Sequence, residues 1–216
     1  MKIEIVNYEP KYRDDIRKIV YYTGFGGESV EPFYDDLESF ADMNSLYYTD
    51  CDDRHNYMAL VDGETAGYLL GCPDTGAYIR RMQTEVGPLM IRKLLSGEYK
   101  VSPLVMKFTL KTIAAALRGE FASAPLDLYP AHLHIDFYEQ YRRIGIGSKI
   151  MNVYFEYLRS LGISGVHLGT SSFHRSALPF YEKLGFQMHR KSRVTDHMYK
   201  KATQEDMYSI TYVKKL

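Results

Sequence analysis

The sequence has no tryptophan, only two cysteines and no formal net charge, with 27 Lys and Arg balanced by 27 Asp and Glu in 216 residues. A chain without net positive charge is not expected to bind nucleic acid nonspecifically. Long apolar runs are also missing, and without a run of about 18 apolar residues no membrane span is predicted. The surroundings of Cys51 and Cys72 do not suggest a disulfide framework, so both are predicted to be free thiols in a reducing cytoplasm.

The first residues, MKIEIVNYEPKYRDD, become acidic and polar where a signal peptide needs an apolar core. We therefore expect a cytoplasmic protein. The composition is otherwise that of an ordinary globular chain, with 45% hydrophobic and 25% charged residues. A chain of this length is sufficient for one well-cored domain, or for a domain with a sizeable insertion.

Hydrophobic periodicity and turn residues divide the chain into strands and helices. In the first third they predict a strand at residues 2–7, a helix at 12–22, a glycine-rich break at 23–29 and a second helix at 32–43, with Pro32 in its first turn. They also predict a hairpin around VDGE, with strands at 57–61 and 66–72. Residues 73–130 are predicted to be a helical insertion, with helices at 77–95 and 103–118 and an irregular return at 117–130.

In the last third, strands are predicted at 131–137, 166–170, from 186 to 189 and at 208–213. Helices are predicted at 147–161 and 177–184. Strand, helix, strand, helix and strand in succession indicate a layered α/β fold.

The segment HLHIDFYEQYRRIGIGS, residues 132–148, contains two candidate sites. His132, His134 and Asp136 alternate with apolar residues, so they share one face of a strand. A metal site there needs further ligands. Phe137 occupies the place where hydrolases with similar spacing carry another histidine, and no other cluster has conventional ligand spacing, so no metal is predicted.

The second candidate site is the turn RRIGIGS between a strand and a helix. A helix start offers unpaired N–H groups and the positive end of its dipole, and glycines let an anion approach them. Arg142 and Arg143 can add charge-assisted contacts. The dinucleotide pattern needs a third glycine where Ile150 stands, and a P-loop is absent. Taken alone, this turn fits a phosphate site and a plain strand-to-helix turn equally well.

Two motifs in order resemble the GCN5-related N-acetyltransferase (GNAT) family. Arg142-x-x-Gly145-x-Gly147 matches the family's first signature, and HRSALPFYEKLGF, residues 174–186, resembles its second. The resemblance covers about residues 131–190 in detail. A softer resemblance, carried by HLHID, GVHLGT and YTGFGGES, is to stand-alone relatives of the acetyltransferase-like domain of O-GlcNAcases.

The resemblance implies one GNAT domain over residues 1–216. Its α/β fold would have a mixed central sheet splayed between strands four and five, flanked by helices, with residues 73–130 inserted before strand four. It also implies acetyl-CoA as co-substrate, with pantetheine along the backbone near Phe137. The implied cofactor-binding residues are Phe137, Arg142, Arg143, Ile144, Gly145, Ile146, Gly147, Ser148, His174 and Tyr181.

Acetyl transfer to an amine needs a deprotonated amine, a stabilised oxyanion and a proton for the leaving thiolate. Tyr181 corresponds to the family's tyrosine acid, and a phenol with a pKa of about 10 stays protonated at neutral pH. Asp136 is our first choice as base or amine-orienting residue, His134 the second and His167 the third. Alternatively, these polar groups form a satisfied buried hydrogen-bond network.

The acceptor side has a charge asymmetry. Residues 28–53 contain nine acidic residues and no Lys or Arg, whereas residues 78–118 contain eight Lys or Arg and two Glu. An acidic segment near the acceptor channel would attract a cationic amine. The alternative is that the acidic and basic segments face each other. The glycine-rich break at 23–29 lies where the family builds its acceptor pocket.

These observations predict an acetyl-CoA-dependent N-acetyltransferase acting on a primary amine of a small molecule or peptide. A second hypothesis is an inactive acyl-CoA-binding regulatory module, because His174 stands where the family often has asparagine. A third is a metal hydrolase that uses HLHID. No nucleic-acid or membrane partner is predicted, and a homodimer through the last strand or the insertion is left open.

Overall fold

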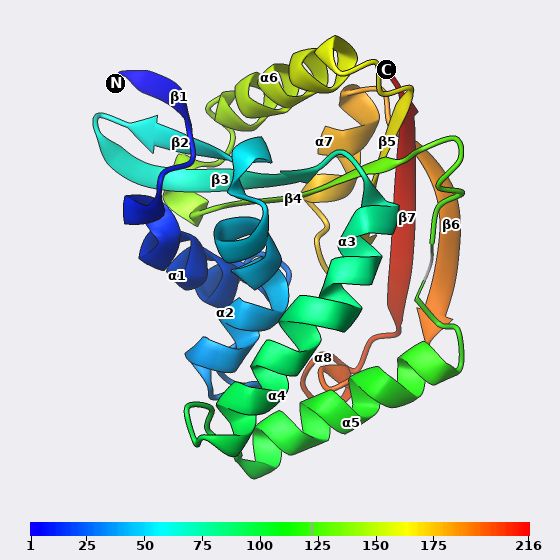
Figure 1. Ribbon diagram of the computed structural model, residues 1–216. Helices are drawn as coiled ribbons and strands as arrows, with labels where there is room; N and C mark the ends of the chain where they lie inside the picture. The colour runs from blue at the N-terminus through cyan, green and yellow to red at the C-terminus, as the bar shows by residue number, and fades with distance from the viewer. Residues whose placement is uncertain (122) are drawn as a thin grey trace.

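The computed structural model describes residues 1–121 and 123–216, so the predicted return at 117–130 lies partly outside the described residues. Seven strands form one mixed sheet in the order β1-β2-β3-β4-β5-β7-β6 (Figure 1). The strands are β1 (Ile3–Asn7), β2 (Tyr57–Val61), β3 (Glu64–Cys72), β4 (Ala131–Phe137), β5 (Gly165–Ser171), β6 (Gln187–Val194) and β7 (Met207–Lys215). The α-helices are α1 (Arg13–Thr23), α2 (Leu37–Leu46), α3 (Thr75–Arg81), α4 (Gly87–Leu95), α5 (Pro103–Leu117), α6 (Ile146–Ser160), α7 (Ala177–Lys183) and α8 (Lys200–Thr203).

The sheet opens between β4 and β5. These strands are parallel, and they pair only through Ala131 with Val166 and His132 with His167. On its other edge β4 stays paired with β3 as far as Phe137, opposite Gly67. The rest of β4 therefore presents backbone groups to the gap rather than to a neighbouring strand. The predicted splay between the fourth and fifth strands is confirmed.

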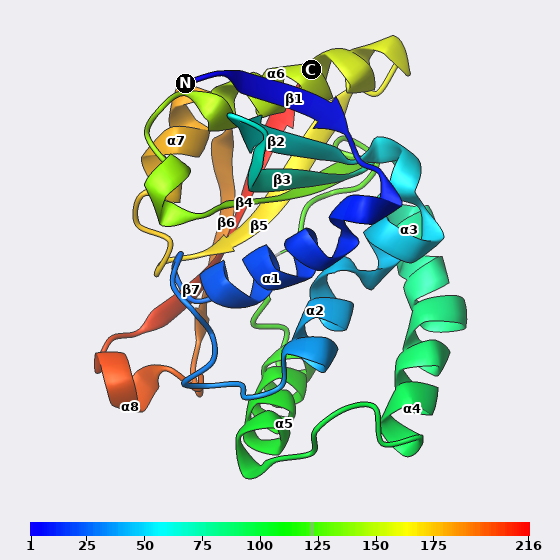
Figure 2. The same cartoon turned by 90° about the vertical axis from the view of Figure 1, so that its left-hand side faces the viewer.

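Helices cover both faces of the sheet. Figure 2 shows α6 and α7 on one face and α1, α2 and the inserted helices on the other. The alternation along β4 determines which side chain meets which layer, because successive residues of a strand point to opposite faces. Leu133 packs into the core under α6 and α7 together with Ile150 and Tyr154. The polar residues of HLHID point to the opposite face.

The hairpin between β2 and β3 is confirmed. Asp62 and Gly63 connect the strands with φ values of 50° and 88°. Two consecutive residues with positive φ form the tight turn that matches strand twist, and an Asp-Gly pair favours it.

The inserted helices α3, α4 and α5 lie between β3 and β4, as predicted. The helix predicted over 77–95 is interrupted by one π-helical turn at Met82–Val86. The prediction that Pro32 begins the second helix is wrong. That helix begins after Asp36, whose carboxylate accepts a hydrogen bond from the Ser39 N–H at 3.2 Å. A capping carboxylate satisfies a free N–H at a helix start, which Pro32 cannot do. The short helix α8 was not predicted.

The acidic and basic segments face each other. Asp42 on α2 contacts Arg17 of α1 and accepts hydrogen bonds from Lys93 Nζ at 2.5 Å and Tyr99 Oη at 2.6 Å. Asp35 contacts Lys100 at 2.5 Å. These ion pairs attach the insertion to the N-terminal helices, so the acidic residues that make them are not available to attract a cationic substrate.

Among the residues that the structure describes, no helix is both long and apolar enough to cross a membrane.

Replacing Asp42 with Asn should lower the free energy of unfolding by about 3–5 kcal/mol, because it leaves the buried cations without their carboxylate. Burial raises the pKa of Asp42, but hydrogen bonds from Lys93, Tyr99 and Arg17 more than offset this, so the pKa lies below its usual value. The contribution should therefore be complete at pH 7 and disappear as the pH falls through that lowered pKa.

Urea unfolding across pH measures this effect. The control is Glu38→Gln, because Glu38 contacts the same arginine but its side chain is 56% exposed. An exposed pair contributes about 1 kcal/mol or less. Equal losses in the two variants would contradict the account.

Candidate functional site

The predicted glycine turn is the start of α6. Gly145 precedes the helix with φ of 84°, and Arg143 also has a positive φ, of 63°. The Lys149 N–H bonds to the Gly145 carbonyl at 3.2 Å. The N–H groups of the first helical turn, from Ile146 to Ser148, precede that bond and have no intrahelical acceptor. Together with the helix dipole, they form a site suited to an anion.

Two aromatic side chains lie close to this turn. A Cβ added to Gly147 would lie 3.1 Å from the Phe180 ring and 3.7 Å from the Phe137 ring. Phe137 in turn needs Gly67, because a Cβ there would come within 2.2 Å of its ring. A side chain at position 147 would therefore have to displace its neighbours, and glycine keeps the helix start open.

Arg142 joins the turn to two other segments. Its Nε and Nη2 donate to the Phe137 carbonyl at 2.9 and 2.7 Å, and Nη2 also lies 2.9 Å from the Gly27 carbonyl. Arg142 thereby connects the end of β4 with the glycine-rich loop after α1. Its guanidinium is committed to backbone carbonyls, so the charge-assisted anion contact predicted for it stays a prediction, whereas Arg143 is exposed.

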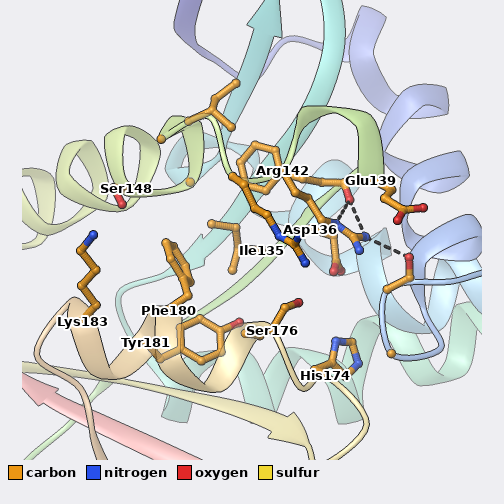
Figure 3. Close-up of a pocket in the computed structure, with 18 residues that line it drawn as sticks. Ile135, Asp136, Glu139, Arg142, Ser148, His174, Ser176, Phe180, Tyr181 and Lys183 are labelled. Atoms are coloured by element: carbon orange, nitrogen blue, oxygen red, sulfur yellow. Dashed lines mark hydrogen bonds between the residues drawn. The ribbon is translucent and has the colours of Figure 1, made fainter.

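A cavity of about 530 Å³ lies between this turn and α7 (Figure 3). Most of the predicted site residues line it: Asp136, Phe137, Arg142, Arg143, Gly145, Ile146, Gly147, Ser148, His174 and Tyr181. Ile144 and His134 are not among the lining residues. Ile144 instead packs against the core under α6 and α7. The sequence spacing thus brings the two motifs to opposite walls of one cavity.

Sequence reasoning assigned no role to several lining residues. Lys183 extends from α7 toward the start of α6, where Ser148 lies (Figure 3). It matches the second motif, and its spacing of two residues from Tyr181 was the signal that could have found it. Ser176, just before α7, and Gly26 and Gly27 also line the cavity. The glycines reach it from a segment far away in the sequence, so no local pattern could indicate them.

Tyr181 is buried among Phe180, Phe186 and Tyr212. Its hydroxyl is directed into the cavity (Figure 3) and has no hydrogen-bond partner among the residues that the structure describes. Burial raises the pKa of this phenol, and the nearby Asp136 carboxylate raises it further. The hydroxyl therefore keeps its proton through the neutral range and is free to donate it to a bound group.

Asp136 forms a polar cluster with Tyr68 and His134. The Tyr68 hydroxyl donates to Asp136 Oδ2 at 3.0 Å, and His134 Nε2 lies 3.4 Å from the same oxygen. Tyr68 Oη also lies 3.2 Å from His134 Nδ1. Within the described residues no hydrogen bond or ion pair involves Asp136 Oδ1, and Asp136 lines the cavity. The cluster fixes the carboxylate through one oxygen.

Both ring nitrogens of His132 take part in hydrogen bonds within the fold. Thr75 Oγ1 donates to the Pro130 carbonyl at 2.7 Å, so its single proton is used and His132 Nδ1–H donates to it at 2.7 Å. His132 Nε2 then accepts from the Tyr48 hydroxyl at 2.8 Å. Burial lowers the pKa of His132 to about 3, with smaller contributions from two neighbouring histidines. A neutral histidine with both nitrogens engaged is not available as a metal ligand.

His167 also lies in the interior, with Nδ1 2.9 Å from the Tyr129 carbonyl. Burial lowers its pKa despite the contacts to backbone carbonyls. Over residues 1–121 and 123–216, no group of three or more His, Cys, Asp or Glu side chains is arranged to hold a metal ion. The structure therefore provides no support for the metal-hydrolase hypothesis.

His174 also lines the cavity. It follows β5, and its N–H donates to the Ser171 carbonyl at 3.1 Å. Burial lowers its pKa, whereas the Asp136 carboxylate acts in the opposite direction. His174 also lines a second cavity, so it separates two spaces.

The mixed sheet with its splayed β4 and β5 and flanking helices matches the GNAT fold. The model of the Acetyltransferase (GNAT) family matches residues 115–186, which include β4, the glycine turn, α6 and α7. The resemblance predicted from the two motifs is therefore confirmed over the segment that contains them. The softer resemblance to O-GlcNAcase-attached domains stays a prediction.

Solved structures agree with the fold. The chain is 23% identical to SsHAT, with a TM-score of 0.75, over 100% of this chain and 98% of that one. An acetyltransferase of the GNAT family from Streptococcus pneumoniae gives 12% identity and a TM-score of 0.57, over 100% and 99% of the two chains. The protein yncA from Salmonella typhimurium, solved with its cofactor acetyl-CoA, gives 10% identity and a TM-score of 0.58, over 99% of this chain and 94% of that one.

Replacing Arg142 with Met should accelerate amide hydrogen exchange in the loop at residues 24–28, because the link between Gly27 and Phe137 is lost. Arg143→Met is a matched control, because Arg143 is the adjacent, exposed arginine. We expect faster exchange of at least about 10-fold for R142M. Hydrogen-exchange mass spectrometry checks this, and similar exchange in R142M and R143M would show that the loop does not depend on Arg142.

Proposed function

We propose that the protein transfers an acetyl group from acetyl-CoA to a primary amine of a small molecule or peptide. The observation that carries this proposal is the unpartnered Tyr181 hydroxyl, which faces the cavity between the open helix start of α6 and the Asp136 carboxylate. A proton donor, an anion site and a carboxylate within one cavity match the needs of acyl transfer to an amine.

The anion site suits the pyrophosphate of CoA. The N–H groups of Ile146, Gly147 and Ser148 would bind its oxygens, with Arg143 and Lys183 supplying positive charge at the rim. The pantetheine arm would lie in the gap where β4 leaves β5, where strand backbone groups lack a neighbour. The cofactor found in yncA supports acetyl-CoA as the co-substrate.

The reaction is a direct attack. The neutral amine adds to the thioester carbonyl, forming the C–N bond and an oxyanion, and the C–S bond then breaks. Tyr181 donates its proton to the departing CoA thiolate, which prevents its return. The amine proton passes to Asp136, directly or through water, and the phenolate recovers a proton from solvent. Backbone N–H groups near Phe137, at the end of β4, would stabilise the oxyanion.

Asp136 is better placed than His134 or His167 for the basic role. Asp136 lines the cavity, whereas His134 does not, and His167 bonds to a backbone carbonyl. His134 therefore acts through Asp136, by positioning its carboxylate together with Tyr68. In this proposal the polar residues of HLHID have two roles. His132 belongs to a satisfied hydrogen-bond network, whereas Asp136 contacts the reacting groups.

The alternative of an inactive acyl-CoA-binding module rests on His174 in place of the family's asparagine. A histidine can still donate and accept hydrogen bonds, so the change alone does not remove activity. The single domain, the cytoplasmic location, the lack of nucleic-acid and membrane partners and a homodimer remain predictions.

Replacing Tyr181 with Phe should lower kcat by about 10²–10⁴-fold, the usual contribution of a general acid, and leave the Kd of acetyl-CoA nearly unchanged. Because the pKa of Tyr181 is raised, wild-type turnover should show no descending limb up to about pH 10. The control is Tyr212→Phe, whose ring contacts Tyr181 but whose hydroxyl donates to Glu182. Steady-state release of free CoA measures both, and undiminished turnover in Y181F would remove Tyr181 from the mechanism.

Replacing Asp136 with Asn should lower kcat/KM for the amine by about 10²-fold or more and make turnover depend more steeply on pH, because the amine must then lose its proton without help. His134→Gln should have a smaller effect, since it removes only a positioning contact. Initial rates from pH 6 to 10 in both variants provide the comparison. A larger loss in H134Q than in D136N would reverse the two assignments.

A further inference from the structure

A second cavity, of about 390 Å³, adjoins the first. The two share Gly26 and His174 as lining residues, so the second cavity begins where the first one ends. It is built from α2, α5 and the segments after β5 and β6. In Figures 1 and 2, α5 and α8 lie at the end of the molecule away from α6, where the first cavity has its anion site. The second cavity is therefore on the side opposite to the proposed cofactor entry.

The walls of this second cavity are largely apolar and contain a group of aromatic rings. Phe40, Phe108, Phe173 and Tyr199 line it, with ring centroids 5.9–6.4 Å apart where they contact one another. The charged residues among its described lining are Lys111 and Asp196, which form an ion pair with each other. Such a space favours a flat apolar group and offers no unpaired carboxylate to a polycation.

One polar atom in this lining lacks a partner. His197 is only 5% exposed, and its Nε2 lies 3.2 Å from the Glu205 carbonyl. A carbonyl only accepts, so Nε2 carries the proton and Nδ1 is left with a lone pair. Nδ1 is buried and has no hydrogen-bond partner within the described residues. Burial lowers the pKa of His197, which keeps the ring neutral and Nδ1 able to accept.

From the shared boundary at His174, the aromatic walls and the orphaned His197 Nδ1, we infer the class of the acceptor. It is a primary arylalkylamine: its aromatic ring occupies the second cavity, a hydroxyl on the ring donates to His197 Nδ1, and its amine reaches past His174 to the thioester. This inference rests on the proposed function, because the amine is placed where Tyr181 and Asp136 can act on it.

Two features argue for a ring that carries a donor. A buried acceptor without a partner disfavours an occupant that leaves it unpaired, so a site of this kind discriminates against analogues lacking the donor. The Phe173 ring lies 5.7 Å from the His197 ring, and Nδ1 itself is buried rather than in solvent. The preferred ligand therefore has an apolar aromatic part, with a hydroxyl on the ring at the end opposite its amine.

Binding to CoA-saturated protein tests the inference apart from turnover. Titration calorimetry would compare tyramine, its O-methyl ether, phenethylamine and spermidine. Tyramine should bind about 10-fold more tightly than its ether or phenethylamine, because only tyramine donates to His197. Spermidine should bind weakest. Equal affinities for tyramine and its ether, or tighter binding of spermidine, would overturn the assignment.

A matched pair of variants locates the ring. Thr112 and Ile113 are neighbours on α5, but Thr112 lines the second cavity, whereas Ile113 is half exposed. Thr112→Phe should weaken tyramine binding by about 10-fold or more by filling the cavity, and Ile113→Phe should not. Neither should alter the Kd of acetyl-CoA. Equal tyramine affinities in T112F and I113F would exclude this cavity.

The ratio of tyramine to ether affinity tests His197 itself. In H197F the ratio should fall to about 1, and in H197N, which keeps a polar group, it should fall less. A ratio within one variant is insensitive to a general loss of affinity, so it remains informative if the fold is weakened. An unchanged ratio in H197F would remove His197 from recognition.

Turnover then separates this inference from the proposed function. Acetylation of spermidine but not of tyramine would refute the arylalkylamine class and leave acetyl transfer intact. Tight and T112F-sensitive tyramine binding, with no acetyl transfer to any amine, would preserve the cavity assignment and refute the proposed function.

Discussion

The site depends on the separation of β4 from β5 and on one side chain, Arg142, that holds the end of β4. Arg142 holds the Phe137 carbonyl at the end of β4 and the Gly27 carbonyl of a loop 115 residues away in the sequence. This one guanidinium links the strand end, next to the glycine turn, to the loop whose Gly26 lines both cavities. Without it, the helix start of α6 would still be electropositive, but the walls facing it would not be fixed relative to it.

Because of this geometry, the polar residues of HLHID lie in different environments. Where β4 is still paired with β5, its polar side chain, that of His132, has both ring nitrogens hydrogen-bonded, to Tyr48 and Thr75. Beyond the pairing, Asp136 lines the cavity, and among the described residues only its Oδ2 has a hydrogen-bond or ion-pair partner. The structural network is observed at His132, whereas the reactive group at Asp136 belongs to the proposed function.

Predictions from local sequence patterns agree with the structure. The glycine turn before α6, the helix that carries Tyr181 and the Asp62-Gly63 hairpin each follow from residues within a few positions of one another. The prediction for the start of α2 was wrong. Pro32 suggested that the helix begins there, but it begins after Asp36, which caps it. The pairing of Asp42 with Lys93 and the second cavity could not be predicted, since they depend on how the insertion packs against α2. A charge count cannot distinguish a substrate-attracting surface from one that is already paired.

The most direct test of the central claim follows the acetyl group itself. Purified protein would be mixed with acetyl-CoA labelled with ¹³C in the acetyl group and with a mixture of primary amines, and the products would be read by mass spectrometry. The account predicts a labelled amide that accumulates in step with free CoA thiol. Release of thiol with labelled acetate as the only product, or binding of acetyl-CoA without any release, would contradict it.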